Sequence, residues 1–144
     1  MVQIEEDEVF SILTGKISTA INRTFLRSFA QEGIDITTEQ WSVLACLWKK
    51  DSVTQQTLCM LTSKDKPSMT RLIDNLEKRS LVQRMPDKSD RRNNLIHLTQ
   101  TGLALQTKAT EIVQNIAAKT LNNITEDEMN VSRVVLKKIM ANLQ

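Results

Sequence analysis

Residues 82–98 read Val82-Gln-Arg-Met-Pro-Asp-Lys-Ser-Asp-Arg-Arg-Asn-Asn-Leu-Ile-His-Leu98, with two short apolar runs around a polar tip. Val82 with Gln83 and Arg84 predicts one strand, and Leu95-Ile-His-Leu98 predicts its return, so that the two strands and the turn between them form a β-hairpin. A tip this polar does not fit a core, and its excess of basic residues indicates contact with a polyanion. Its charged residues are Asp87, Lys88, Asp90, Arg91 and Arg92.

The size and composition of the chain indicate one mainly helical domain. It has 144 residues, 40% of them hydrophobic and 3% aromatic, with only three glycines and two prolines to interrupt helices. No apolar run approaches the roughly 20 residues of a membrane helix, and the acidic segment 5–8 is unlike a signal peptide. We therefore expect a cytoplasmic protein that does not bind membranes. Cys46 and Cys59 are too few for a disulfide framework or a zinc site, and we expect buried thiols.

The basic residues are concentrated in one segment. Residues 64–92 carry a net charge of +4, whereas the rest of the chain carries −2. This local excess favours an anionic partner, and nucleic acid ahead of membrane because the segment lacks a broad apolar face.

Three helices are predicted before the basic segment. Apolar residues at spacings of three and four predict a helix from about Glu5 to Glu32, which Gly33 would end. Thr37 and Gln40 form a capping-box pattern at the start of a second helix, which stops near residues 49–52. A third, short helix begins at about residue 54, capped by either Ser52 or Thr54.

The next helix carries the residues of greatest interest. Pro67 suits the first turn of a helix, which is preceded by Asp65 or Lys66 and runs to about Arg79. One face is apolar and the opposite one is a narrow polar strip. Two short helices, a tight turn and a hairpin make a winged helix-turn-helix, in which the second helix enters the major groove of DNA. The alternative is an ordinary αα-hairpin without DNA binding. The basic tip of the β-hairpin favours the winged helix-turn-helix over this alternative.

The C-terminal third is predicted to be two helices. Thr99 can cap a helix that reaches about Asn122, and Thr125 with Glu128 is a second capping box that opens the last helix. Both helices carry more apolar residues than one small domain needs to cover, which suggests a helical dimerisation layer together with the first helix. The expected organisation is a DNA-binding lobe at about 37–99, and dimerisation helices at about 5–33 and 100–144, within one domain of residues 1–144.

Three segments of the sequence resemble the signature of MarR-type transcriptional regulators. They are Thr70-Arg-Leu-Ile-Asp-Asn-Leu-Glu-Lys-Arg-Ser-Leu-Val82, Asp87-Lys-Ser-Asp-Arg-Arg92 and Leu98-Thr-Gln-Thr-Gly102, and residues 38–41 resemble the start of that family's second helix. The resemblance implies a mainly α fold with a small β-hairpin wing: a winged helix-turn-helix lobe plus an N- and C-terminal helical dimerisation layer. The family often has glycine where this chain has Ser80, which would cost about 1 kcal/mol in a left-handed conformation.

The resemblance also implies a function. Family members are homodimers that bind double-stranded DNA at one pseudo-palindromic operator, most often as repressors, and many are released by a small aromatic or phenolic effector. Others sense oxidants through a cysteine helped by tyrosines, and peroxide sensing of that kind is not expected here because the first helix lacks cysteine and the chain lacks tyrosine.

Several side chains of the fourth helix are candidates for DNA contact. Arg71 lies on the polar strip, where a guanidinium can pair with guanine or hold a phosphate. Ser68 and Thr70 can bond base edges or phosphates, and Lys64 and Lys66 can reach the backbone. Asp74 shares the strip, and its spacing predicts a pair with Arg71 or Lys78.

At the wing, an aspartate is expected to hold one arginine and leave the other to point outward. By resemblance, Arg91 enters the minor groove while Arg92 forms the internal pair with one of the two bracing aspartates, Asp87 or Asp90, and the reverse assignment stays open. Lys88 would add a phosphate contact.

The remaining candidates are fewer. Trp41 and Trp48 are expected in the core, where they could also line a cleft for an aromatic ligand. His97 is the only histidine and lacks partners for a metal site, and no cofactor is implied. A chain with one histidine, no glycine-rich phosphate loop and no visible nucleophile with a base is not expected to be an enzyme. The alternative to a DNA-binding regulator is a helical dimeric adaptor that binds protein.

Overall fold

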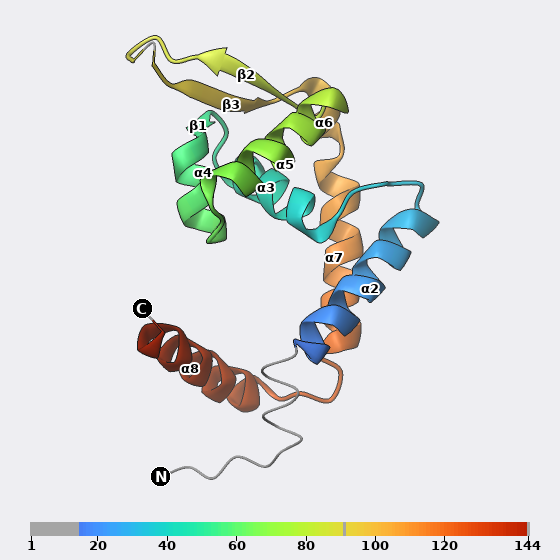
Figure 1. Cartoon of the computed structure of the whole chain (residues 1–144). Helices are drawn as coiled ribbons and strands as arrows, with labels where there is room; N and C mark the ends of the chain where they lie inside the picture. The colour runs from blue at the N-terminus through green and yellow to red at the C-terminus, as the bar shows by residue number, and fades with distance from the viewer. Residues whose placement is uncertain (1–14, 91, 144) are drawn as a thin grey trace.

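The computed structural model describes residues 15–90 and 92–143. The chain is mostly helical with one small antiparallel sheet (Figure 1). Its elements in order are α2 (Lys16–Gln31), α3 (Thr38–Lys49), β1 (Val53–Thr54), α4 (Gln55–Thr62), α5 (Lys66–Lys78), β2 (Val82–Pro86), β3 (Asn94–Leu98), α6 (Gln100–Ala104), α7 (Gln106–Thr120) and α8 (Glu126–Asn142).

The predicted helix caps are largely confirmed. Thr37 and Gln40 form a full capping box at α3, and Thr125 with Glu128 forms another at α8. Thr54, and not Ser52, caps α4 by accepting a hydrogen bond from the Thr57 backbone N–H.

The extent of the first helix is a correction. Gly33 has a φ of 70° just beyond α2, as expected of a glycine that ends a helix. Gly15, however, has a left-handed φ of 65° and directly precedes the first residue of α2. The prediction of one helix that runs unbroken from residue 5 through this glycine was therefore wrong. The first part of that expected helix, residues 5–14, lies outside the described residues.

The hairpin is confirmed, and it belongs to a three-stranded sheet in the order β1-β3-β2. Val82 pairs with Leu98 and Met85 with Leu95, so the strands are longer than the sequence indicated. Strand β1 was not predicted, because its two residues are too short for a periodic signal, yet Val53 pairs with Ile96 and joins the helix-turn-helix to the wing. Ser80, in the turn before β2, has a φ of 56°, the left-handed conformation considered for it.

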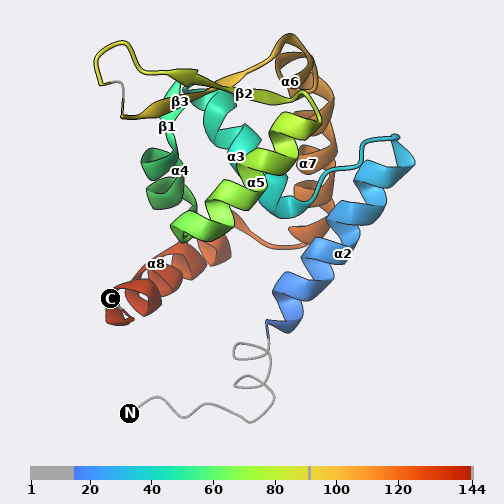
Figure 2. The same ribbon diagram turned by 45° about the horizontal axis from the view of Figure 1, so that its top comes forward.

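Helices α2, α3, α4, α5 and α7 share one continuous hydrophobic core with the sheet. The buried face of α5 packs on α3 and α4 beneath the sheet, while α2 packs beside α7 (Figure 2). The largest fully buried side chains are Phe29, Leu44, Leu47, Leu58, Met69, Ile73, Leu76, Ile96, Val43 and Val82. Burial of one face of α5 turns its other face outward.

The C-terminal helices leave apolar surface uncovered. The single helix expected up to residue 122 is two, α6 and α7, with Leu105 between them. Helix α8 stands apart from the lobe and has no buried residue (Figure 1). Its exposed apolar side chains are Val131, Val134, Val135, Leu136, Ile139 and Met140. Among the helices that the structure describes, none has the length and apolar character to cross a membrane.

Candidate nucleic-acid interface

Helix α5 begins with a cap that fixes its first turn. The carboxylate of Asp65 accepts a hydrogen bond of 2.7 Å from the Ser68 backbone N–H, and these bonds to Ser68 lower the pKa of the Asp65 carboxyl below its ordinary value. Arg71, one turn further on, is exposed, and the described residues contain no ion pair with it. Its guanidinium is therefore available for a ligand outside the chain.

Thr70 and Lys66 are joined to the preceding helix. Gln55, at the start of α4, donates from Nε2 to the Thr70 hydroxyl at 2.7 Å and lies 3.4 Å from the Lys66 carbonyl oxygen. Thr70 in turn donates to the same carbonyl at 2.9 Å. Gln55 was not singled out in the sequence, because nothing local distinguishes a glutamine that reaches across to a neighbouring helix.

Lys64 is less available than its position suggested. Its Nζ lies 2.8 Å from Glu39 Oε1 of α3, and its side chain is 21% exposed. This ion pair connects the turn of the helix-turn-helix to α3 and occupies the ammonium group. Lys66, by contrast, is exposed and takes part in no ion pair among the described residues.

Arg84 of β2 holds the wing against α5. Its guanidinium lies 2.6 Å from Asp74 Oδ1 and 2.6 Å from Glu77 Oε2, and Glu77 also accepts from the Arg84 backbone N–H. The expectation that Asp74 pairs with Arg71 or Lys78 was therefore wrong, because an arginine from the neighbouring strand is closer. Strand alternation could have revealed Arg84, which lies on the same side of β2 as the buried Val82.

Hydrogen bonds within the wing tip fix its conformation. Asp90 accepts from Arg92 Nε at 3.2 Å, and Asp87 accepts from both the hydroxyl and the backbone N–H of Ser89. The Ser89 bonds lower the pKa of the Asp87 carboxyl. Lys88 is exposed at the tip. Arg91, assigned by resemblance to the minor groove, lies outside the described residues.

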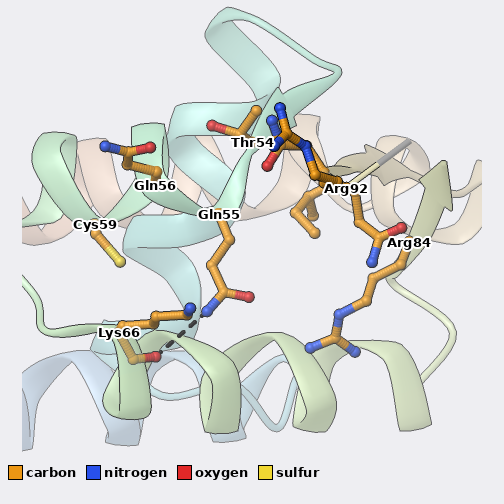
Figure 3. A pocket seen from close by; sticks show the side chains of 10 residues that line it. Thr54, Gln55, Gln56, Cys59, Lys66, Arg84 and Arg92 are labelled. Carbon is orange, nitrogen blue, oxygen red and sulfur yellow. Dashed lines mark hydrogen bonds between the residues drawn. The ribbon is translucent and has the colours of Figure 1, made fainter. Parts of the chain in front are cut away.

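A groove of about 540 Å³ separates the wing from the helix-turn-helix (Figure 3). Lys66 of α5, Arg84 of β2 and Arg92 of the wing tip all line it, and Gln55 reaches into it from α4. Of the predicted DNA contacts, Lys66 therefore lines this polar groove together with Arg92 of the wing tip. Lys64, Arg71 and Lys88 are not among its lining residues. The whole lining is Thr54, Gln55, Gln56, Cys59, Lys66, Arg84, Arg92, Asn93, Asn94 and Ile96.

The two tryptophans lie elsewhere, between α3 and α7. They line a cavity of about 300 Å³ together with Thr110 and Val113. The indole N–H of Trp48 donates to the Gly102 carbonyl at 3.0 Å, whereas that of Trp41 is buried and lacks a hydrogen-bond partner among the described residues. Cys46, on the same helix, has its thiol pKa raised by burial, so its thiolate is disfavoured.

Comparisons with known proteins agree with this geometry. A model of the MarR family matches residues 36–93, which span the helix-turn-helix and most of the wing. The multiple antibiotic resistance protein MarR of Escherichia coli K12 is 31% identical over 108 residues, which are 74% of this chain and 75% of that protein. The transcriptional repressor NicR of Pseudomonas putida is 26% identical over 114 residues, covering 78% and 72%.

Solved structures of similar fold include proteins bound to DNA. The complex of S. aureus MepR with DNA has a TM-score of 0.85 and 28% identity, over 94% of this chain and 98% of that one. A mutant of E. coli MarR in complex with operator DNA has a TM-score of 0.82 and 26% identity, over 96% and 99%. The chain therefore belongs to the MarR family of transcriptional regulators.

Proposed function

We propose that the protein is a homodimeric, sequence-specific repressor that binds a pseudo-palindromic operator in the cytoplasm. The observation that carries this proposal is the outward face of α5, where Arg71 is exposed and has no ion pair among the described residues. The wing that follows α5 in the chain carries further basic residues. The related MarR and MepR structures bound to DNA support it. Each lobe would place α5 in a major groove and the wing against the flanking backbone.

The homodimer is supported by the uncovered apolar surface. Helix α8 exposes six apolar side chains, and on α2 Ile17 and Ile21 are also exposed. A monomer would present these side chains to water, whereas a second copy would bury them. Two lobes related by a two-fold axis require half-sites about one helical turn apart, roughly 10 base pairs.

Selection of binding sites from random duplexes tests the proposal directly. We expect one inverted repeat to be enriched, with an affinity that falls steeply as salt rises because basic side chains displace counterions from phosphates. A folded dimer that enriches no motif would contradict the proposal and favour the protein-binding adaptor.

The wing assignment has its own test. We propose that Arg91 enters the minor groove while Asp90 holds Arg92, with Asp87 stiffening the tip and Lys88 contacting a phosphate. Arg91→Ala should then weaken operator binding more than Arg92→Ala, with little change in melting temperature for either. If Arg92→Ala has the larger effect, the two arginines have the reverse roles.

We further propose that a small aromatic or phenolic effector binds between Trp41 and Trp48 and releases DNA. The cavity there is lined by both rings, and the buried indole N–H of Trp41 finds no acceptor among the described residues, which a phenolic oxygen could supply. Binding should quench tryptophan fluorescence with the same dependence on ligand concentration as operator release. Trp41→Phe keeps an aromatic ring and removes the N–H, so it should weaken the response to the effector while leaving operator affinity in its absence unchanged. Equal responses in parent and variant would contradict this site.

A further inference from the structure

The hydroxyl of Thr70 is engaged by two neighbours. It donates to the Lys66 carbonyl oxygen one turn back at 2.9 Å, and it accepts from Gln55 Nε2 of α4 at 2.7 Å. The orientation of the Gln55 amide follows from its surroundings, because Nε2 also lies 3.4 Å from the Lys66 carbonyl, which can only accept. Both helices of the helix-turn-helix thus hold this hydroxyl.

A threonine hydroxyl has one proton to donate, and that of Thr70 is donated in a hydrogen bond to the backbone carbonyl oxygen of Lys66. The oxygens of phosphate, the O6 and N7 atoms of guanine and the O4 atom of thymine all require a donor. Thr70 can serve none of them without giving up its bond to Lys66. A hydroxyl that was expected to bond base edges or phosphates is therefore not available to donate.

With the hydroxyl proton of Thr70 engaged within the chain, its methyl group is the other part of the side chain that can contact DNA. Thr70 is half-buried and directly precedes the exposed Arg71, in the N-terminal half of the helix that would enter the groove. In the major groove the C5-methyl of thymine is the apolar group that a threonine methyl contacts. We propose that Thr70 selects thymine at one position of each half-site through its methyl group, with Gln55 and Lys66 fixing the rotamer.

This inference rests on the proposed operator binding, and a scan with uracil tests it. Uracil differs from thymine only by the missing C5-methyl. Each thymine of the selected operator is replaced in turn, symmetrically in both half-sites, and the affinities of the full-length dimer are compared at fixed salt. We expect one position at which the parent loses about fourfold for each methyl removed, the value of one buried methyl-sized group.

Two matched variants assign that position to Thr70. Thr70→Val keeps the methyl and removes the hydroxyl, so it should retain the uracil penalty. Thr70→Ser keeps the hydroxyl and removes the methyl, so it should bind thymine and uracil operators equally at that position. Unfolding curves of both variants control for the loss of the Gln55 bond.

The possible failures are distinguishable. A parent that selects no operator overturns the proposed function, and this inference with it. A parent that binds its operator but tolerates uracil at every position overturns this inference alone. So does a Thr70→Val variant that loses affinity while Thr70→Ser keeps both its affinity and the uracil penalty, since the hydroxyl would then be the group that contacts DNA.

Discussion

Replacing Asp74 by asparagine separates two views of the acidic residues near the DNA-binding face. Simple charge counting predicts tighter DNA binding, because Asp74→Asn removes a negative charge close to phosphates. The structure predicts weaker binding, because Asp74 Oδ1 lies 2.6 Å from Arg84 Nη2 and so attaches the wing to α5. The two views give effects of opposite sign.

The magnitude follows from the geometry of the pair. Charge-assisted hydrogen bonds contribute about 1.5–3 kcal/mol and fully exposed ion pairs about 0.2–1 kcal/mol. The Arg84 side chain is 24% exposed and that of Asp74 is 46% exposed, which places this pair between the two classes. We therefore expect the free energy of unfolding to fall by about 1 kcal/mol. If the same free energy must be supplied when the wing is ordered on DNA, operator affinity falls about fivefold at each half-site.

The assay combines urea unfolding with operator titration at one salt concentration. Arg84→Met provides the second arm of a double-mutant cycle, because it keeps the aliphatic stem and removes the charge. In that background Asp74→Asn should have no further effect on stability. Tighter operator binding by Asp74→Asn, or an undiminished effect in the Arg84→Met background, would refute the view that Asp74 acts through Arg84.

Three further outcomes are expected. Glu39→Gln should tighten operator binding, because it releases Lys64 from an ion pair of 2.8 Å. The affinity should then depend more steeply on salt, by about one counterion, in a salt titration. An unchanged slope would place Lys64 away from phosphate. Gly102→Ala should destabilise the protein by about 1–3 kcal/mol or more in urea unfolding, because its Cβ would lie 2.0 Å from the Leu81 carbonyl oxygen, and wild-type stability would contradict this contact. The lowered pKa of Asp65 means that its cap contributes stability above the unfolded pKa and loses it as pH falls through the folded value, below about pH 4. Asp65→Asn should therefore unfold with a weaker pH dependence in acid, and identical acid unfolding curves would contradict this.

The candidate site was partly predictable from sequence. The apolar and polar faces of α5 follow from a period of 3.6 residues, so the spacing alone places Arg71 on the outer face. The availability of its neighbours does not follow from spacing. Lys64 and Thr70 were predicted to contact DNA in addition to Arg71. In the structure, however, Lys64 forms an ion pair with Glu39, and the Thr70 hydroxyl is hydrogen-bonded to Gln55 and to the Lys66 carbonyl oxygen.

The local elements of this protein follow from its sequence alone. Caps such as Thr37 and Thr125 act over three residues, and the basic hairpin between β2 and β3 is contained in 17 consecutive positions, so each can be recognised within a short window. Which polar side chains meet depends on the packing of elements that lie far apart in the chain. Glu39 and Lys64 are 25 positions apart, and Gln55 and Thr70 are 15 apart. Such contacts depend on how whole elements pack together, and the side-chain types alone allow several partners at similar free energy.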